Sequence, residues 1–197
     1  MGVLIVDTKV ANLASVGFAF DRLGVAHKTS DDPAEIASAD RVLIPGVGAA
    51  PYAMRKIREA GLLDVLRRLE QPVLGICLGM QLLFETLDEG GETVEGLGLV
   101  PGHVGALDTG DLPSPHMGWN TLQSVADDPV TAGVKPGDYA YFVHSYAAPV
   151  GDATLASAEY GQPFTAIVRH GNVRGCQFHP ERSAQTGATI LKAFATL

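Results

Sequence analysis

The sequence predicts an α/β fold, a flavodoxin-like open parallel and mixed sheet with flanking helices and an antiparallel extension in the second half. In the first half, short apolar runs alternate with amphipathic segments, which is the pattern of successive βαβ units. In the second half, strand-like segments follow one another with little helix between them. The length of 197 residues suits one domain, and we expect residues 1–197 to form it.

Short runs in the first half predict strands, and the periodic segments between them predict helices. Continuous apolar character, as at Val3–Val6, is expected of a strand buried on both faces. Asn12 is placed to cap the first helix, and Gly24 is placed to end it. The predicted strands are residues 3–6, 25–28, 41–45 and 73–77, and the predicted helices are residues 13–24, 52–70 and 78–87.

The second half predicts an antiparallel region that closes with a helix. The polar, glycine-rich residues 88–98 are expected to form a surface loop. Residues 169–173, "RHGNV", indicate a tight hairpin turn. The predicted strands are residues 99–107, 120–125, 139–147, 154–159, 165–169 and 173–178, followed by an amphipathic helix over residues 184–197.

Composition argues against nucleic-acid and membrane partners. Lys and Arg number 14 against 22 Asp and Glu, a net charge of −8, and no basic cluster stands out. No apolar run approaches the roughly 20 residues that span a bilayer. The start "MGVLIVD" lacks the basic flank and cleavage site of a signal peptide. Together with only two cysteines, this predicts a cytoplasmic protein with reduced thiols.

Cys77 has the sequence context of a nucleophile. It lies in Gly75-Ile76-Cys77-Leu78-Gly79, where a strand passes into a helix, and Gly-x-nucleophile-x-Gly forms a sharp turn in this position. We expect the two glycines to be needed because side chains there would collide across the turn. The helix that begins at Leu78 would favour the thiolate, and the Leu78 N–H would face an oxyanion.

A thiolate nucleophile needs a base and a residue that orients the base. His179 follows a predicted strand, and Glu181, two residues on, is placed to accept a hydrogen bond from its ring. His144 is a second candidate base without an adjacent carboxylate, and His-x-Glu lacks the third ligand of a zinc pattern. Cys176 lies within a predicted strand and is interpreted as structural.

Three separated motifs together resemble the class I, triad-type glutamine amidotransferase family. They are "PGVG" at 45–48, "GICLGMQLLF" at 75–84 and "GCQFHPERS" at 175–183, and the match spans nearly the whole chain. Within that family, "HMGWN" at 116–120 and "YFVHSY" at 141–146 are similar to the glutaminase subunits of imidazole glycerol phosphate synthases, which serve histidine biosynthesis.

The resemblance implies hydrolysis of glutamine through a cysteine thioester, without cofactor or metal. It implies Cys77 as nucleophile, His179 as proton donor and Glu181 as the residue that holds His179. Backbone donors to the oxyanion would come from Gly46, Val47, Gly48 and Leu78. Contacts to glutamine would come from Gln81, His144, Ser145 and Tyr146.

The resemblance also implies a heterodimer with a (β/α)₈-barrel cyclase that receives the ammonia. The residues that match its interface are Asn12, Trp119, Tyr141 and Arg182, and a core position is the other interpretation of Trp119. The chain departs from the family at residues 7–12, "DTKVAN", where the usual two glycines are missing, and at Arg182, where lysine is usual.

Three other functions are compatible with the same motifs. The chain could be the glutaminase of another amidotransferase, although "HMGWN" argues against it. It could be a non-catalytic regulatory module of the same fold, although such a module needs no complete set of Cys77, His179 and Glu181. It could also be a thiol sensor or another cysteine hydrolase, which would react with electrophiles without protection by glutamine.

Overall fold

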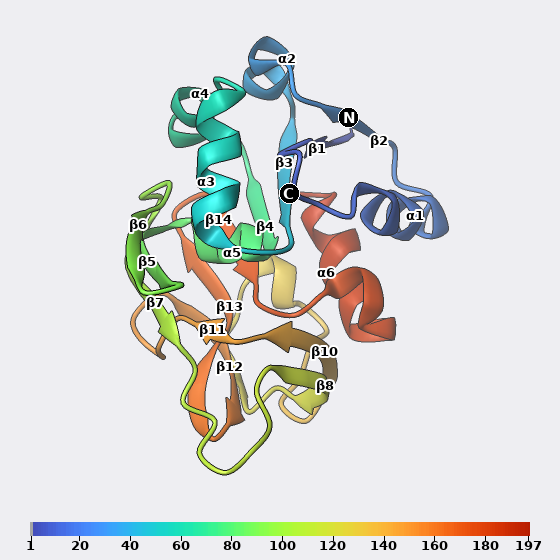
Figure 1. Cartoon of the computed structure of the whole chain (residues 1–197). Helices are drawn as coiled ribbons and strands as arrows, with labels where there is room; N and C mark the ends of the chain where they lie inside the picture. Colours follow the sequence, from blue (N-terminus) through green and yellow to red (C-terminus); the bar gives the residue numbers. More distant parts are fainter. Residues whose placement is uncertain (1) are drawn as a thin grey trace.

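The computed structural model describes residues 2–197, and within them a single eight-stranded sheet runs through the molecule (Figure 1). The strand order is β2-β1-β3-β4-β14-β13-β12-β9. The parallel strands are β2 (His27–Ser30), β1 (Val3–Val6), β3 (Arg41–Gly46), β4 (Val73–Cys77) and β14 (Val173–Cys176). The antiparallel strands are β13 (Gln162–His170), β12 (Thr154–Tyr160) and β9 (Ser124–Val125). This sheet confirms the predicted fold class.

Helices cover both faces of the parallel strands (Figure 1). Helices α1 (Leu13–Leu23) and α6 (Ala184–Phe194) pack on one face around Phe20 and Phe194. On the other face, Met54 and Ile57 lie in the core formed by the remaining helices. These are α2 (Pro33–Ser38), α3 (Ala50–Glu59), α4 (Leu63–Arg67) and α5 (Leu78–Leu82).

Two small sheets lie beside the main sheet (Figure 1). One pairs β10 (Tyr139–His144) with β8 (His116–Thr121) in antiparallel register. The other has the order β11 (Tyr146–Ala147), β7 (Val100–Ala106), β5 (Phe84–Glu89) and β6 (Glu92–Glu95). Single 3₁₀ turns lie at η1 (Pro129–Thr131) and η2 (Pro180–Arg182).

The structure confirms the predicted ends of the first helix and the predicted hairpin turn. The Asn12 side chain accepts a hydrogen bond from the Ser15 N–H at 3.2 Å and caps α1, and Gly24 ends the helix with φ +66°. His170 pairs with Val173, so the predicted hairpin turn is present. None of the helices within residues 2–197 combines the length and the apolar character that crossing a bilayer requires.

The helix predicted over 52–70 is two helices. Gly61 has φ +69°, which a continuing helix does not accommodate, and α3 ends at Glu59 before α4 begins at Leu63. Helix α2 was not predicted, although Asp32 and Pro33 carry its start signals. The Asp32 carboxylate accepts from the Ala34 N–H at 2.7 Å, and Pro33 occupies the first turn.

The helix predicted over 78–87 is wrong beyond Leu82. Residues from Phe84 onward form β5 instead, which pairs with β6 and β7. The Leu83 carbonyl already accepts from the N–H groups of Leu99 and Val100, at 2.8 and 2.9 Å. An apolar run is compatible with both states, and strand pairing decides between them here. The same pairing places β6 inside the predicted loop 88–98.

Two predicted strands are interrupted. The strand expected at 120–125 is the end of β8 together with β9, and these belong to different sheets. The strand expected at 139–147 is broken at Ser145, which separates β10 from β11. The "HMGWN" motif therefore lies on an antiparallel strand directly opposite "YFVHSY".

Candidate active site

The carboxyl ends of β3 and β4 meet at a pocket with a volume of about 270 Å³. Ligand sites in open α/β sheets lie at this edge, because side chains from neighbouring strand ends converge there. Residues from both halves of the chain line it: Val47, Gly48, Cys77, Leu78, Gln81, Glu89, Pro115, Val143, His144, Ser145, Tyr146 and His179.

Cys77 stands on a strained turn between β4 and α5. Its backbone has φ 53° and ψ −114°, a conformation that side-chain-bearing residues rarely adopt. A Cβ atom on Gly75 would lie 2.7 Å from the carbonyl oxygen of Gly79, so the first glycine avoids the expected collision across the turn. The turn therefore places Cys77 at the end of the strand, where it lines the pocket.

Glycine is required at position 79 for a different reason from the predicted one. A Cβ atom on Gly79 would overlap the carbonyl oxygen of Ile44 in the neighbouring strand β3. Gly79 thus permits α5 to approach the sheet closely, which fixes where the helix starts. Because α5 has only five residues rather than the predicted ten, its dipole at Cys77 is smaller than expected.

His179 lies beside the thiol and is held by Glu181. The Nδ1 atom of His179 is 2.8 Å from Oε1 of Glu181, and because a carboxylate only accepts, Nδ1 is the donor. The ring and the Cys77 thiol line the same pocket. The backbone N–H of His179 donates to the Tyr141 carbonyl at 2.9 Å, which fixes the ring's position against β10.

The His179 ring is charged at neutral pH. Burial acts against the charged form, but hydrogen bonds and charges from Cys77 and Glu181 outweigh it and raise the pKa of His179 to about 10. The ring is therefore an imidazolium that can give a proton to a leaving group. The structure thus brings two of the predicted triad residues, Cys77 and His179, to one pocket, with the third, Glu181, hydrogen-bonded to the His179 ring.

The two cysteines lie in contrasting environments. Cys77 is 7% exposed and opens onto the pocket, with its Sγ 3.7 Å from the Val143 carbonyl oxygen and 4.0 Å from Nε2 of Gln177. Cys176 is fully buried within β14, and burial raises the pKa of its thiol. The geometry agrees with interpreting Cys176 as structural.

The predicted oxyanion segment borders the pocket, but one of its donors is occupied. The Val47 N–H donates to the Val10 carbonyl at 3.0 Å, away from Cys77. Gly48 has φ +88°, a conformation that favours glycine. Leu78 lies in the pocket wall directly after Cys77, whereas Gly46 is packed against Leu78 and Gly79 behind it.

The predicted glutamine contacts form one wall of the pocket. Gln81 is 6% exposed, and its Nε2 donates to the Tyr146 carbonyl at 2.9 Å and to Oε1 of Gln177 at 3.1 Å. The ring nitrogens of His144 contact the Tyr146 carbonyl and His116, so neither is free to serve Cys77 as a base. Of the two candidate bases, the geometry therefore favours His179.

Sequence reasoning missed Glu89, which lines the pocket, and Gln177, whose side chain contacts two residues that line it. Glu89 lies at the end of β5, where a surface loop over residues 88–98 was predicted, and its Oε2 accepts from the Ala50 N–H. Gln177 is completely buried and joins Gln81 to the thiol. The one available signal for Gln177 was its place beside the Phe178-His179 strand end.

The predicted interface residues gather on the other side of His179. Asn12, Tyr141 and Arg182 line a second pocket of about 240 Å³ that also includes His179 and Glu181. Trp119 is 53% exposed and packs edge-on against Tyr141, with ring centroids 5.8 Å apart. The core interpretation of Trp119 is therefore wrong.

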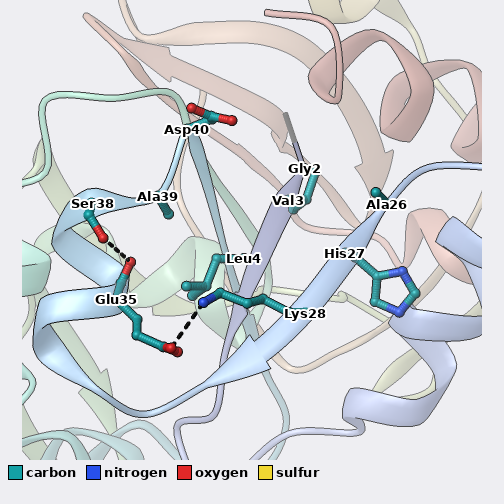
Figure 2. Close-up of a pocket in the computed structure, with 10 residues that line it drawn as sticks. All are labelled: Gly2, Val3, Leu4, Ala26, His27, Lys28, Glu35, Ser38, Ala39 and Asp40. Carbon is teal, nitrogen blue, oxygen red and sulfur yellow. Dashed lines mark hydrogen bonds and ion pairs between the residues drawn. The ribbon is translucent and has the colours of Figure 1, made fainter.

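A hollow with a larger volume, about 400 Å³, lies far from this site, at the amino ends of β1 and β3 (Figure 2). Lys28 and Glu35 form an ion pair across it at 3.1 Å, and the Ser38 hydroxyl donates to the Glu35 carbonyl. These polar groups satisfy one another within the protein. We therefore assign the candidate active site to the pocket at Cys77.

Comparisons with known proteins agree with this site. A family model described as "Glutamine amidotransferase class-I" matches residues 6–196. The chain is 51% identical to imidazole glycerol phosphate synthase subunit HisH of Vibrio cholerae, with 99% of this chain and 98% of that protein covered. It is 52% identical to the protein of the same name from Idiomarina loihiensis, with 100% and 98% covered.

Solved structures show the same fold at low identity. A crystal structure of a glutamine amidotransferase superposes with a TM-score of 0.75 at 20% identity, and all of both chains is covered. A glutamine amidotransferase from Thermotoga maritima gives 0.62 at 18% identity, with 98% of this chain and 82% of that chain covered. The sheet, the elbow and the match of a family model over residues 6–196 agree, and this chain belongs to the class I glutamine amidotransferases.

Proposed function

We propose that this chain is the glutaminase subunit of imidazole glycerol phosphate synthase, which hydrolyses glutamine and delivers ammonia to a cyclase subunit in histidine biosynthesis. The observation that carries the proposal is that Cys77 and His179 line one pocket while the His179 ring is hydrogen-bonded to Glu181. Identity of about half over nearly the full length of the HisH proteins supports the choice of this synthase. We take residues 1–197 as one domain, because the main sheet draws strands from both halves.

In the proposed reaction, the Cys77 thiolate attacks the side-chain amide carbon of glutamine. The imidazolium of His179 gives its proton to the departing nitrogen, and ammonia leaves a glutamyl thioester on Cys77. Neutral His179 then takes a proton from the water that attacks the thioester. The carbon–sulfur bond breaks, glutamate leaves, and the thiolate and imidazolium are restored.

We propose that backbone N–H groups of Leu78 and of the Gly46–Val47–Gly48 segment stabilise the oxyanion. Removing one such donor typically costs about 2.7–4 kcal/mol of transition-state stabilisation. Val47 can contribute only after its N–H leaves the Val10 carbonyl, so that hydrogen bond must break before the hole is complete. An incomplete oxyanion hole would make hydrolysis slow until the segment rearranges.

We propose that glutamine lies against the wall formed by Gln81, His144, Ser145 and Tyr146. The pocket also contains Glu89, whose carboxylate offers a negative charge to the α-ammonium group of an amino-acid substrate. Glu89 lies at the end of β5, whereas Gln81 lies on α5 and His144 at the end of β10. This arrangement would orient the side-chain amide toward Cys77.

We propose that a (β/α)₈-barrel cyclase docks on the surface around Asn12, Trp119, Tyr141 and Arg182 and forms a heterodimer. Ammonia released into water becomes ammonium, which has no lone pair with which to attack, so it must pass directly to the partner. The second pocket, which reaches His179 and Glu181 from this surface, supports that route. The half-exposed Trp119 supports a protein partner, because interfaces are enriched in tryptophan.

The test is to mix the purified chain with the cyclase and its nucleotide substrate and to measure glutamate release. We expect the cyclase to stimulate release, and we expect Cys77→Ala to abolish it while ammonia-dependent synthesis by the complex persists. Cys176→Ala is the matched control and should keep its activity. Activity in Cys77→Ala would refute the mechanism, and stimulation only by a different synthase domain would refute the choice of synthase.

A further inference from the structure

Two buried histidines form a hydrogen-bonded pair behind the glutamine wall. His116 on β8 and His144 on β10 are register partners in the small antiparallel sheet. The Nδ1 atom of His116 lies 3.0 Å from the Nε2 atom of His144. Their exposed fractions are only 2% and 5%, so water does not compete for these nitrogens.

The hydrogen bonds determine which nitrogen of each ring carries the proton. Nδ1 of His144 is 2.9 Å from the Tyr146 carbonyl oxygen, which only accepts, so Nδ1 is the donor. In a neutral ring, Nε2 of His144 is then an acceptor, and Nδ1 of His116 must donate to it. Burial supports neutral rings, because it lowers the pKa of His144 to about 3 and that of His116 to about 4.

Asn120 completes the chain of donors. Its Nδ2 is 3.3 Å from Nε2 of His116 and donates to the Glu159 carbonyl at 2.8 Å. Its Oδ1 accepts from the Thr121 N–H at 2.8 Å, which fixes the orientation of the amide. Every hydrogen bond therefore points one way, from Asn120 through His116 and His144 to Tyr146.

Aromatic packing prevents the His116 ring from turning. It is stacked between Phe142 and Tyr160, with ring centroids 4.9 and 4.1 Å away. Both histidines are thereby held in the Nδ1–H tautomer, whereas the Nε2–H form predominates for histidine in water. The chain of hydrogen bonds ends on the Tyr146 carbonyl, which also accepts from Gln81. One backbone oxygen thus anchors two of the groups that line the pocket.

We propose that His116 and Asn120 are positioning residues for glutamine binding. They hold the tautomer of His144, and His144 in turn holds the Tyr146 carbonyl and the pocket wall. Neither residue lines the pocket, and their side-chain hydrogen bonds go to each other, His144, Glu159 and Thr121. Their role rests on the proposed function, because it concerns how tightly the glutaminase site holds its substrate.

The first test separates binding from chemistry in the complex with the cyclase. His116→Phe keeps a planar ring between Phe142 and Tyr160 but removes both nitrogens. We expect the KM for glutamine to rise about tenfold with kcat within about twofold of wild type, since the catalytic residues are untouched. His116→Asn restores a donor near the Nδ1 position and should recover part of this loss.

His103→Phe is the matched control. His103 also bonds through both ring nitrogens, to Thr86 and Asp88, but it lies outside the pocket. It should leave KM unchanged. An unchanged KM in His116→Phe, or a fall in kcat alone, would overturn the positioning role. A wild-type complex that hydrolyses no glutamine would instead refute the proposed function.

The second test needs no variant. Nitrogen NMR of the wild-type chain, with ¹⁵N-labelled histidine and assigned rings, reports which nitrogen is protonated. We expect His116 and His144 both to show the Nδ1–H tautomer and to stay neutral at about pH 6. An Nε2–H form or a positive charge on either ring would overturn the proposal, whatever the enzyme's activity.

Discussion

The protonation of His179 is central to the site, because its ring is hydrogen-bonded to Glu181 and shares the pocket with Cys77. Burial alone would lower its pKa below 6.5, yet those two neighbours raise it to about 10. A pKa raised by folding stabilises the native state fully below about pH 6.5, and that contribution is lost as the pH rises through 10. The same proton is the one that we propose ammonia receives.

Glu181→Gln should shift the alkaline limit of glutamine hydrolysis to lower pH. The substitution removes a charge that raises the pKa of His179, so the ring loses its proton earlier as the pH rises. We expect glutamate release by the cyclase complex to fall about tenfold more at pH 9 than at pH 6, relative to wild type. Glu59→Gln, which changes an exposed carboxylate on α3, serves as control. Identical pH profiles for Glu181→Gln and wild type would contradict this prediction.

Local motifs made several of these residues predictable. Cys77 lies within a Gly-x-Cys-x-Gly motif, and Glu181 is only two residues from His179. Residues adjacent in sequence therefore indicated these three site residues. Glu89 gave no such signal, and His116 stood out only as part of the "HMGWN" motif, without a predicted role. Glu89 reaches the pocket through a strand pairing between β5 and β7, and His116 reaches His144 through the register of β8 against β10. Such pairings depend on contacts distant in sequence.

At the scale of single elements, the short helix α5 and the strands beside it decide the geometry of Cys77. The sequence predicted the β4 strand and the start of α5 correctly, but it extended the helix to residue 87. Residues 83–87, "LFETL", fit a helix or a strand equally well, and hydrogen bonds from Leu99 and Val100 to Leu83 favour the strand. Helix α5, which begins directly after Cys77, is therefore packed against β3, and the chain that follows it is held in the sheet of β11, β7, β5 and β6.

Gly79→Ala should destabilise the protein through the contact between α5 and β3. The new methyl group would overlap the Ile44 carbonyl oxygen, and a backbone atom cannot move aside cheaply. We expect the free energy of unfolding to fall by about 3 kcal/mol in denaturant titrations. Gly151→Ala adds its methyl group where nothing lies within 4 Å, and it should change stability by about 0.5 kcal/mol or less. Equal stability of the two variants would contradict the close packing of α5.

At the scale of the whole molecule, a buried ion pair ties the sheet to the segment before η1. Arg174 on β14 donates through Nε and Nη2 to the two carboxylate oxygens of Asp128, at 2.7 and 2.9 Å. The Asp128 side chain is completely buried, and that of Arg174 is 8% exposed. Burial disfavours the charged form of the Asp128 carboxyl group, but the hydrogen bond from Arg174 outweighs this effect and holds the pKa of Asp128 below 3.8.

Arg174→Met should leave Asp128 buried without its main partner. Breaking such a pair typically costs about 3–5 kcal/mol, and we expect a loss of that size in the free energy of unfolding at neutral pH. The depressed pKa of Asp128 means that its contribution is present above pH 3.8 and is lost as the pH falls further, so the variant's deficit should shrink in acid. Lys28→Met, which breaks an exposed pair with Glu35, should cost much less, because solvent screens such pairs. A similar loss in both variants would contradict the buried pair's role.

The most direct test of the proposed function is where a glutamine-like electrophile attaches. A chloroketone analogue of glutamine, incubated with the cyclase complex and mapped by mass spectrometry, should modify Cys77 and leave Cys176 free. Excess glutamine should slow the labelling, because both compounds compete for the same pocket. Labelling of Cys176, or labelling of Cys77 that glutamine does not slow, would contradict a glutaminase site built on Cys77.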